Sequence, residues 1–236
     1  MRRLTIVLPV LDEAAIIIGA LLALAPLRAR GVEVVVVDGG SSDGTRHLAR
    51  PLADSVIAVS RGRGAAMNAA VALATGDALV FLHADTALPD DADRLVMSAL
   101  AHRAWGRFDL RIAGRHPLLA VVARSINWRS RLTGIATGDQ AIFVTRQAFL
   151  AVGGFPELPL MEDIAISRRL KELCRPFCIA RPVVTSGRRW EHYGVIRTIV
   201  LMWRLRLAYY LGVAPARLAQ RYGPVPPSPA QGSAGP

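Results

Sequence analysis

The chain has 236 residues, a formal net charge of +11 and a hydrophobic fraction of 52%. This length allows one large α/β domain or two small ones, with a sizeable core. No apolar run is long enough to cross a bilayer, which excludes a protein built around a long membrane domain. Lys171 is the only lysine. The arginine excess favours contact with the phosphates of a nucleotide or of anionic lipids, unless it reflects codon usage alone.

The start of the chain and its cysteines indicate a reducing compartment. Asp12 and Glu13 closely follow the N-terminal apolar run with no small-residue cleavage site, which argues against a signal peptide. Cys174 and Cys178 are the only cysteines, too few for a zinc site, so we expect two reduced thiols. We therefore predict a cytoplasmic protein.

The first 90 residues alternate strand and helix patterns. Short apolar runs predict strands at 4–10, 32–37, 56–59 and 78–82. Ala-rich segments predict helices at 14–29 and 64–74. The turn at 38–45 opens a further helix, with Ser42 or Asp43 expected as its N-cap. Strands that alternate with helices imply right-handed crossovers and a parallel sheet.

After residue 90 this alternation ends. The remaining patterns predict helices at 91–102, 118–132, 147–152, 164–173 and 195–213, and strands at 105–112 and 141–145. We expect the strand that contains Arg107 to be half exposed, because charged and apolar residues alternate along it. The helix at 164–173 should bury Ile166, Leu170 and Leu173. The tail at 223–236 is rich in Pro, Gly, Ser and Ala, so we expect it to be disordered.

Polar residues follow the ends of all four strands in the first half. They are Asp12 with Glu13, Asp38, Arg61 with Arg63, and His83 with Asp85. Ligands of an open parallel sheet bind outside these carboxyl ends. Acids beside a phosphate site would repel it unless they bind the base, the sugar or a metal. We therefore predict a nucleoside-diphosphate ligand with a cation.

The arginines and the glycine-rich turn each allow two interpretations. Asp38, at the strand end, can accept a hydrogen bond from a base or ribose, whereas Asp43 fits a turn cap. The turn lacks Gly-x-Gly-x-x-Gly, so no dinucleotide fingerprint is present. Arg61 and Arg63 precede a helix that contains Asn68, an arrangement that favours phosphate binding. The alternative is a solvated basic loop.

Two further pairs carry candidate chemistry. His83 and Asp85 lie on the same side of an extended chain. One carboxylate with diphosphate oxygens and water suits Mg²⁺ or Mn²⁺, and His83 either joins that metal or packs as a hydrogen-bonded histidine. Glu162 and Asp163 open a helix after an apolar stretch. They either complement the helix dipole or provide a base for an acceptor hydroxyl.

The chain resembles family 2 of the glycosyltransferases, inverting enzymes with the GT-A fold. The matching segments run in family order and are Leu8-Pro9-Val10-Leu11-Asp12-Glu13, Val37 to Thr45, Gly76-Asp77, Phe81 to Thr86, Gly138-Asp139-Gln140, Gly153-Gly154-Phe155, Met161-Glu162-Asp163 and Ser186 to Trp190. Within the family, it is similar to the bacterial subgroup named for arsenosugar biosynthesis, also labelled radical-SAM/selenodomain-associated. Some similar sequences carry a carotenoid-acid glycosyltransferase name.

The resemblance implies roles for individual residues at the donor site. Pro9, Glu13 and Asp38 would contact the nucleotide. Asp85 matches the last acid of the family's Asp-x-Asp metal motif, whereas His83 stands where the first Asp usually lies. This departure leaves the identity and affinity of the metal open.

The resemblance also implies roles in the second half. Asp163 matches the catalytic base, and Arg189 with Trp190 matches an Arg-Trp pair near the diphosphate and the acceptor. Ser186 stands where a processive synthase would have Gln. Since there is also no long membrane domain, we expect transfer of a single sugar.

We therefore predict an α/β protein with the GT-A fold, a single domain over 1–222. Residues 1–90 would form a Rossmann-like nucleotide-binding half with a mostly parallel sheet, and residues 91–222 the acceptor half. The predicted enzyme is an inverting hexosyltransferase that uses a nucleotide sugar, expected to be a UDP-sugar. Its acceptor would be a small molecule or lipid-like. Mg²⁺ or Mn²⁺, assisted by Arg63 or Arg189, would neutralise the leaving diphosphate, while Asp163 takes the acceptor proton.

Three other classes share parts of this pattern. A sugar-phosphate nucleotidyltransferase would share the nucleotide half but needs a Gly-rich signature that residues 4–12 lack. A nucleic-acid-binding module would suit the charge but needs aromatic and basic residues interleaved on a strand, so we expect no nucleic-acid partner. A non-catalytic nucleotide-binding protein would have no need of Asp163.

The apolar segment at 195–213 also has two interpretations. A spanning helix would have to bury Arg197, Arg204 and Arg206, at about 2.5–3.5 kcal/mol each even on lenient scales. Trp203 is of a residue type enriched at membrane interfaces. The helix therefore either lies peripherally on the anionic inner face of the membrane or packs on the core with its arginines in solvent.

Overall fold

The computed structural model describes residues 3–59 and 62–223. Within these ranges one sheet of eight strands has the order β3-β2-β1-β4-β7-β6-β8-β5. The strands are β1 (Leu4–Val10), β2 (Glu33–Asp38), β3 (Ser55–Ala58), β4 (Ala78–Phe81), β5 (Thr86–Ala87), β6 (Trp105–Ala113), β7 (Phe143–Thr145) and β8 (Phe177–Ser186). The predicted tail beyond Gly223, and Arg61, lie outside the described residues.

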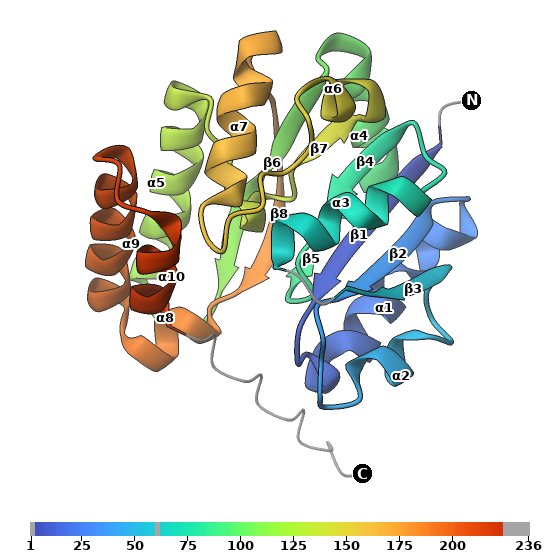
Figure 1. Ribbon diagram of the computed structural model, residues 1–236, viewed down its shortest axis with the longest axis horizontal. Coiled ribbons are helices and arrows are strands. Elements are labelled where there is room, and N and C mark those ends of the chain that lie inside the picture. Colours follow the sequence, from blue (N-terminus) through green and yellow to red (C-terminus); the bar gives the residue numbers. More distant parts are fainter. Residues whose placement is uncertain (1–2, 60–61, 224–236) are drawn as a thin grey trace.

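Helices cover both faces of this sheet (Figure 1). They are α1 (Ala14–Ala29), α2 (Thr45–Ala49), α3 (Arg63–Leu73), α4 (Ala92–His102), α5 (Leu118–Thr133), η1 (Gly138–Gln140), α6 (Arg146–Ala151), α7 (Glu162–Leu173), α8 (Arg188–Tyr193), α9 (Val195–Tyr210) and α10 (Pro215–Tyr222). Apolar residues of α1, α4 and α5 pack on one face. Those of α3, α6 and α7 pack on the other. This is the α/β arrangement that the alternating pattern predicted.

The first half is a parallel sheet, as predicted. β1 pairs in parallel with both β2 and β4, and β2 with β3. Because strand side chains alternate, Ile6 and Leu8 face α1, whereas Val7 faces α3. Both faces are therefore buried, which explains the unbroken valines of β2. The carboxyl ends of β1, β2 and β4 consequently open at one edge.

The second half contains the antiparallel pairs and a strand that the sequence did not predict. β7 runs antiparallel to β4 and β6, whereas β8 runs parallel to β6. A β-carbon on Gly106 would lie 2.2 Å from the Phe177 carbonyl oxygen, so only glycine allows this close approach. The register shifts between Phe108 and Asp109, which marks a bulge in the pairing with β8.

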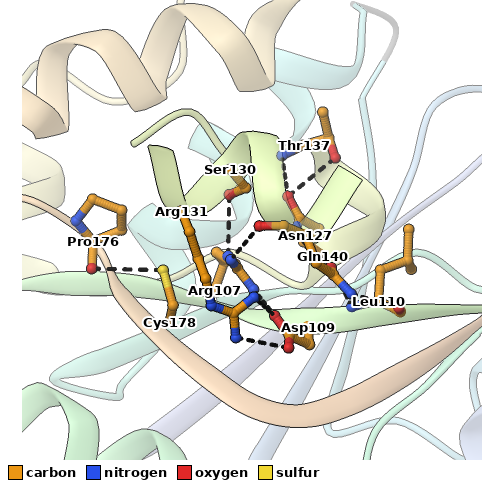
Figure 2. A network of polar contacts seen from close by, with 10 residues as sticks. All are labelled: Arg107, Asp109, Leu110, Asn127, Ser130, Arg131, Thr137, Gln140, Pro176 and Cys178. Atoms are coloured by element: carbon orange, nitrogen blue, oxygen red, sulfur yellow. Dashed lines mark hydrogen bonds and ion pairs between the residues drawn. The ribbon is translucent and has the colours of Figure 1, made fainter. Parts of the chain in front are cut away.

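The prediction that this strand is half exposed is wrong for its first half, because Arg107 is fully buried. Its guanidinium donates to the Ser130 hydroxyl at 3.1 Å and to the Asn127 carbonyl at 3.1 Å, and pairs with Asp109 (Figure 2). Arg131 also binds Asp109, at 2.7 Å. These partners offset the cost of desolvating the charge. The network fastens α5 onto β6.

Two smaller expectations also need correction. Leu173 is exposed rather than buried, because α7 ends there, whereas the predicted Ile166 and Leu170 do reach the core. The N-cap of α2 is Gly44, at φ +88°, rather than Ser42 or Asp43. Asp43 still accepts a hydrogen bond from the Thr45 amide at 3.0 Å.

The helices α5, α9 and α10 lie together at one end of the molecule (Figure 1). Leu205 of α9 and Leu218 of α10 pack with Met161 and Ile164 at the start of α7. In the described part of the chain, no helix has the length and apolarity needed to cross a membrane. The helices α9 and α10 therefore pack beside the start of α7, next to the edge of the sheet where the strands of the first half end.

Candidate active site

A cleft of about 730 Å³ opens at the carboxyl ends of β1 and β4, between the two halves of the chain. From the predicted set it is lined by Pro9, Glu13, Arg63, His83, Asp85, Glu162, Asp163, Arg189 and Trp190. Topology brings these residues together, because parallel strands end at the same edge and α7 and α8 begin beside it.

Asp38 and Asn68 are not among the residues that line the cleft. The buried Asp38 carboxylate accepts hydrogen bonds from the Ser41 amide, at 3.1 Å, and from the Ser41 hydroxyl. The Asn68 side chain exchanges two hydrogen bonds with the Phe155 backbone, at 2.8 and 2.9 Å. Through these hydrogen bonds, both residues stabilise loops that border the cleft. The nucleotide contact of Asp38 stays a prediction.

Arg188 joins two of the predicted acids. Its guanidinium contacts the Glu13 carboxylate at 2.8 and 3.2 Å and the Asp85 carboxylate at 3.5 Å. Burial opposes the charged form of Arg188, yet the hydrogen bonds and charge of Glu13, with the charge of Asp85, raise its pKa. One permanent cation thus compensates both carboxylates. The sequence did not reveal this role, because Glu13 lies 175 residues away along the chain.

His83, Gly138 and Asp163 meet at the floor of the cleft. The Gly138 amide donates to Asp163 Oδ2 at 2.9 Å. A β-carbon on Gly138 would lie 2.7 Å from His83 Nε2. Burial and the charge of Arg63 lower the pKa of His83, against the opposing charges of nearby carboxylates. The imidazole is therefore neutral at pH 7, the form that can bind a metal.

His83 and Asp85 fit a hard divalent cation whose remaining ligands come from the diphosphate and from water. The described residues contain no group of three or more His, Cys, Asp or Glu side chains able to hold a metal alone. His83 and Asp85 offer one neutral imidazole and one carboxylate. Mg²⁺ and Mn²⁺ take oxygen ligands readily and would complete their shells with diphosphate oxygens and water.

Glu162 and Asp163 begin α7, directly after Met161, which holds a left-handed φ of +69°. This conformation is costly for a non-glycine residue and turns the first carboxylates of α7 toward the cleft. Burial, then the charge of Asp163, raise the pKa of Glu162. Arg63 opposes this shift from 3.5 Å. The two adjacent acids are thus in different environments.

The C-terminal segment closes the other side. The Arg189 guanidinium lies 3.6 Å from the ring centre of Tyr222 and donates to its carbonyl. Both Tyr222 and Trp190 line the cleft. Burial raises the pKa of Tyr222. Neither α10 nor a role for Tyr222 was predicted from the sequence, although Pro215 at the first turn of α10 is a helix-start signal.

The amino-acid sequence is similar to those of known glycosyltransferases and of a succinoglycan biosynthesis protein. Residues 5–144 match the family described as "Glycosyl transferase family 2". The succinoglycan biosynthesis protein ExoA of Rhizobium meliloti (strain 1021) is 45% identical over 109 residues, which cover 41% of this chain and 32% of ExoA. This chain therefore spans about a third of that relative's length.

Solved structures show the same fold. A mannosyltransferase from Pyrobaculum calidifontis, in complex with GDP-Man and Mn²⁺, is 26% identical with a TM-score of 0.66, covering 95% of this chain and 66% of that one. S. aureus TarS 1-349 with UDP-GlcNAc is 18% identical with a TM-score of 0.63, covering 78% of this chain and 58% of that one. The strand-end cleft, the GT-A-like neighbours and the match over most of the chain agree: the protein belongs to glycosyl transferase family 2.

Proposed function

We propose that this cleft transfers one hexose, with inversion, from a nucleoside-diphosphate sugar to a small-molecule or lipid-like acceptor. A UDP-sugar is the expected donor. The observation that carries this proposal is the single cleft in which Asp163, the His83 and Asp85 pair, and the cations Arg63 and Arg189 converge. The relatives solved with GDP-Man and UDP-GlcNAc support a nucleotide-sugar donor. Membership of the arsenosugar-related subgroup stays a prediction.

The Asp163 carboxylate is oriented to act as the base. Its Oδ2 accepts from the Gly138 amide at 2.9 Å, and its Oδ1 accepts from the Ile164 amide at 2.7 Å. In the proposed step, the acceptor oxygen attacks the anomeric carbon while the bond to the diphosphate breaks. The acceptor proton passes to Asp163. Glu162, whose pKa is raised, pairs with Arg63 beside this carboxylate.

The leaving diphosphate needs positive charge near the strand ends. Asp85 and His83 would hold Mg²⁺ or Mn²⁺, which supplies Lewis-acid charge when bound. Arg63 and Arg189 line the same cleft and would add fixed cations. Neighbours solved with Mn²⁺ support this cofactor. Arg61 remains a candidate phosphate contact outside the described residues.

The test compares Asp163→Asn with Glu162→Gln in a panel of UDP-, GDP- and dTDP-sugars with Mn²⁺. Asp163→Asn should lower sugar transfer or donor hydrolysis by roughly 100-fold or more, a typical effect of losing a general base. Donor binding in a thermal-shift assay should persist in both variants. Full turnover in Asp163→Asn would refute the assigned base, and no response to any nucleotide sugar would refute the proposed function.

The exposed surfaces of α5 and α9 support a second, peripheral membrane role. The large exposed apolar side chains of α5 and α9 are Leu118, Val121, Trp128, Leu132, Ile196, Val200, Trp203, Leu207 and Tyr210. They recur at helical spacing and form a stripe on each helix. No acid occurs in α5, α9 or α10, while arginines occur in all three. We propose that this apolar and basic surface lies on an anionic leaflet, as would suit a lipid-like acceptor.

Flotation with vesicles tests the membrane proposal. The wild-type protein should bind vesicles that contain anionic lipid at low salt, and high salt should release it. Trp128→Gln with Trp203→Gln should lose this binding, since the two side chains are 68% and 73% exposed. Leu73→Gln, a 58% exposed control on α3, should retain it. Equal binding to neutral and anionic vesicles would overturn the proposal.

A further inference from the structure

Arg189 is a buried cation of the cleft that contacts two aromatic rings. It lies on α8, a helix of six residues. The centre of its guanidinium is 5.4 Å from the ring centre of Tyr193, which lies one turn further along the same helix. It is only 3.6 Å from the ring centre of Tyr222 on α10. The nearer ring therefore comes from another helix, 33 residues away along the chain.

Apolar packing anchors α10 and so fixes the position of Tyr222. Leu218 lies one turn before Tyr222 on the same face of α10 and is fully buried. It packs in an apolar cluster with Met161 and Ile164, the residues on either side of the two acids that begin α7, and Tyr222 packs against this cluster. The helix α10 therefore connects Arg189 to the helix that carries the proposed base.

The ring and the carbonyl of Tyr222 restrict different motions of the guanidinium. The ring covers a face of the group, and the carbonyl accepts a hydrogen bond from Nη2. Stacking fixes the plane of a guanidinium, and all five of its N–H bonds point outward within that plane. A long side chain that is already ordered does not lose its rotamer freedom again when a ligand binds. Ordering Arg189 in the free protein therefore lowers the entropic cost of binding an anion.

Arg189 and Tyr222 both line the cleft that contains His83, Asp85 and Asp163. On the basis of the proposed function, we infer that Tyr222 is a positioning residue, whose ring holds Arg189 with its donors directed at the leaving diphosphate. The donor site is then completed by α10, which lies with α8 and α9 at one end of the molecule (Figure 1). Removing the ring should consequently weaken donor binding.

Single variants of the full chain test this role, with UDP, GDP and dTDP as probes in the presence of Mn²⁺. The nucleotide that the wild type binds most tightly is then used throughout. Tyr222→Leu keeps an apolar side chain but removes the ring, and should raise the Kd by roughly five- to tenfold, because Arg189 then spends less time in the binding rotamer. Tyr222→Phe keeps the ring and should bind like the wild type. Tyr209→Leu should do so too, since Tyr209 packs on the same cluster but is not among the residues that line the cleft.

A double-mutant cycle separates positioning from a structural role. Arg189→Met alone should raise the same Kd. Adding Tyr222→Leu to Arg189→Met should raise it no further, because the ring then has no guanidinium to hold. A structural role would instead make the two effects additive. If Tyr222→Leu does not fold, Tyr222→Met takes its place in the cycle, because its flexible side chain adapts to the same space.

Several results would overturn the inference. They are additive effects in the cycle, an unchanged Kd in Tyr222→Leu, and weakened binding by Tyr222→Phe or Tyr209→Leu. Tighter binding by Tyr222→Leu would also overturn it, because the contact would then withhold Arg189 from the donor. A wild-type protein that binds none of the three nucleotides would refute the proposed function itself, and the inference with it.

Discussion

Replacing Arg188 by Met tests how the two acids of the donor site are held together. The guanidinium contacts the Glu13 and Asp85 carboxylates, and the Met side chain keeps much of the apolar stem. Without the cation, two neighbouring carboxylates face each other uncompensated. The folded protein should therefore lose stability, with no change in the core.

The structure sets the expected size of this loss. Breaking a fully buried ion pair costs about 3–5 kcal/mol, and breaking an exposed pair about 0–1 kcal/mol. The side chains of Arg188, Glu13 and Asp85 are 11%, 19% and 20% exposed, so we expect about 2 kcal/mol. For a chain of this size, each kcal/mol shifts Tm by about 2–4 °C. Tm should consequently fall by about 4–8 °C.

The assay is thermal unfolding in chelator-treated buffer, with Arg28→Met as the control. Arg28 pairs with Asp54 at 2.6 Å, but these side chains are 29% and 39% exposed, so its loss should cost about 1 kcal/mol or less. Added Mn²⁺ should recover part of the loss in Arg188→Met, because a cation at Asp85 replaces some of the missing charge. Equal Tm values for both variants would refute the reasoning.

Three other outcomes are expected. Asp85→Ala should abolish turnover and the Mn²⁺-dependent part of nucleotide binding with the fold intact, and near-normal activity in chelator-treated buffer would refute its metal role. Gly138→Ala should cost about 1–3 kcal/mol and lower turnover, because its β-carbon would meet His83 Nε2 at 2.7 Å; an unchanged Tm would refute this crowding. Glu162 has a pKa raised above its ordinary 4.5, so the folded state binds its proton more tightly than the unfolded chain. Stability should fall as pH rises from about 4.5 through that raised pKa, and urea titrations across this range should show a smaller fall in Glu162→Gln.

Local pattern predicted most elements of the fold. The helix α1 begins and ends at the predicted residues, and β1 does the same. The apolar residues of these elements follow the period of a helix or of a buried strand, so each segment's own sequence is enough to predict it. By contrast, β8 carries Arg181 and Pro182 and has no such period. It is a strand because β6 pairs with it along the sheet, a contact that no local pattern contains.

The sequence by itself determined which polar residues follow the strand ends, and therefore that Glu13, His83 and Asp85 meet at one edge. Tertiary structure alone decided how their charges are balanced, because Arg188 reaches Glu13 across 175 residues. The physical reason is that the alternation of buried and exposed side chains is repeated among residues that are close together in sequence. Desolvation and charge pairing instead depend on distances across the folded chain, and these exist only once the helices have packed against the sheet.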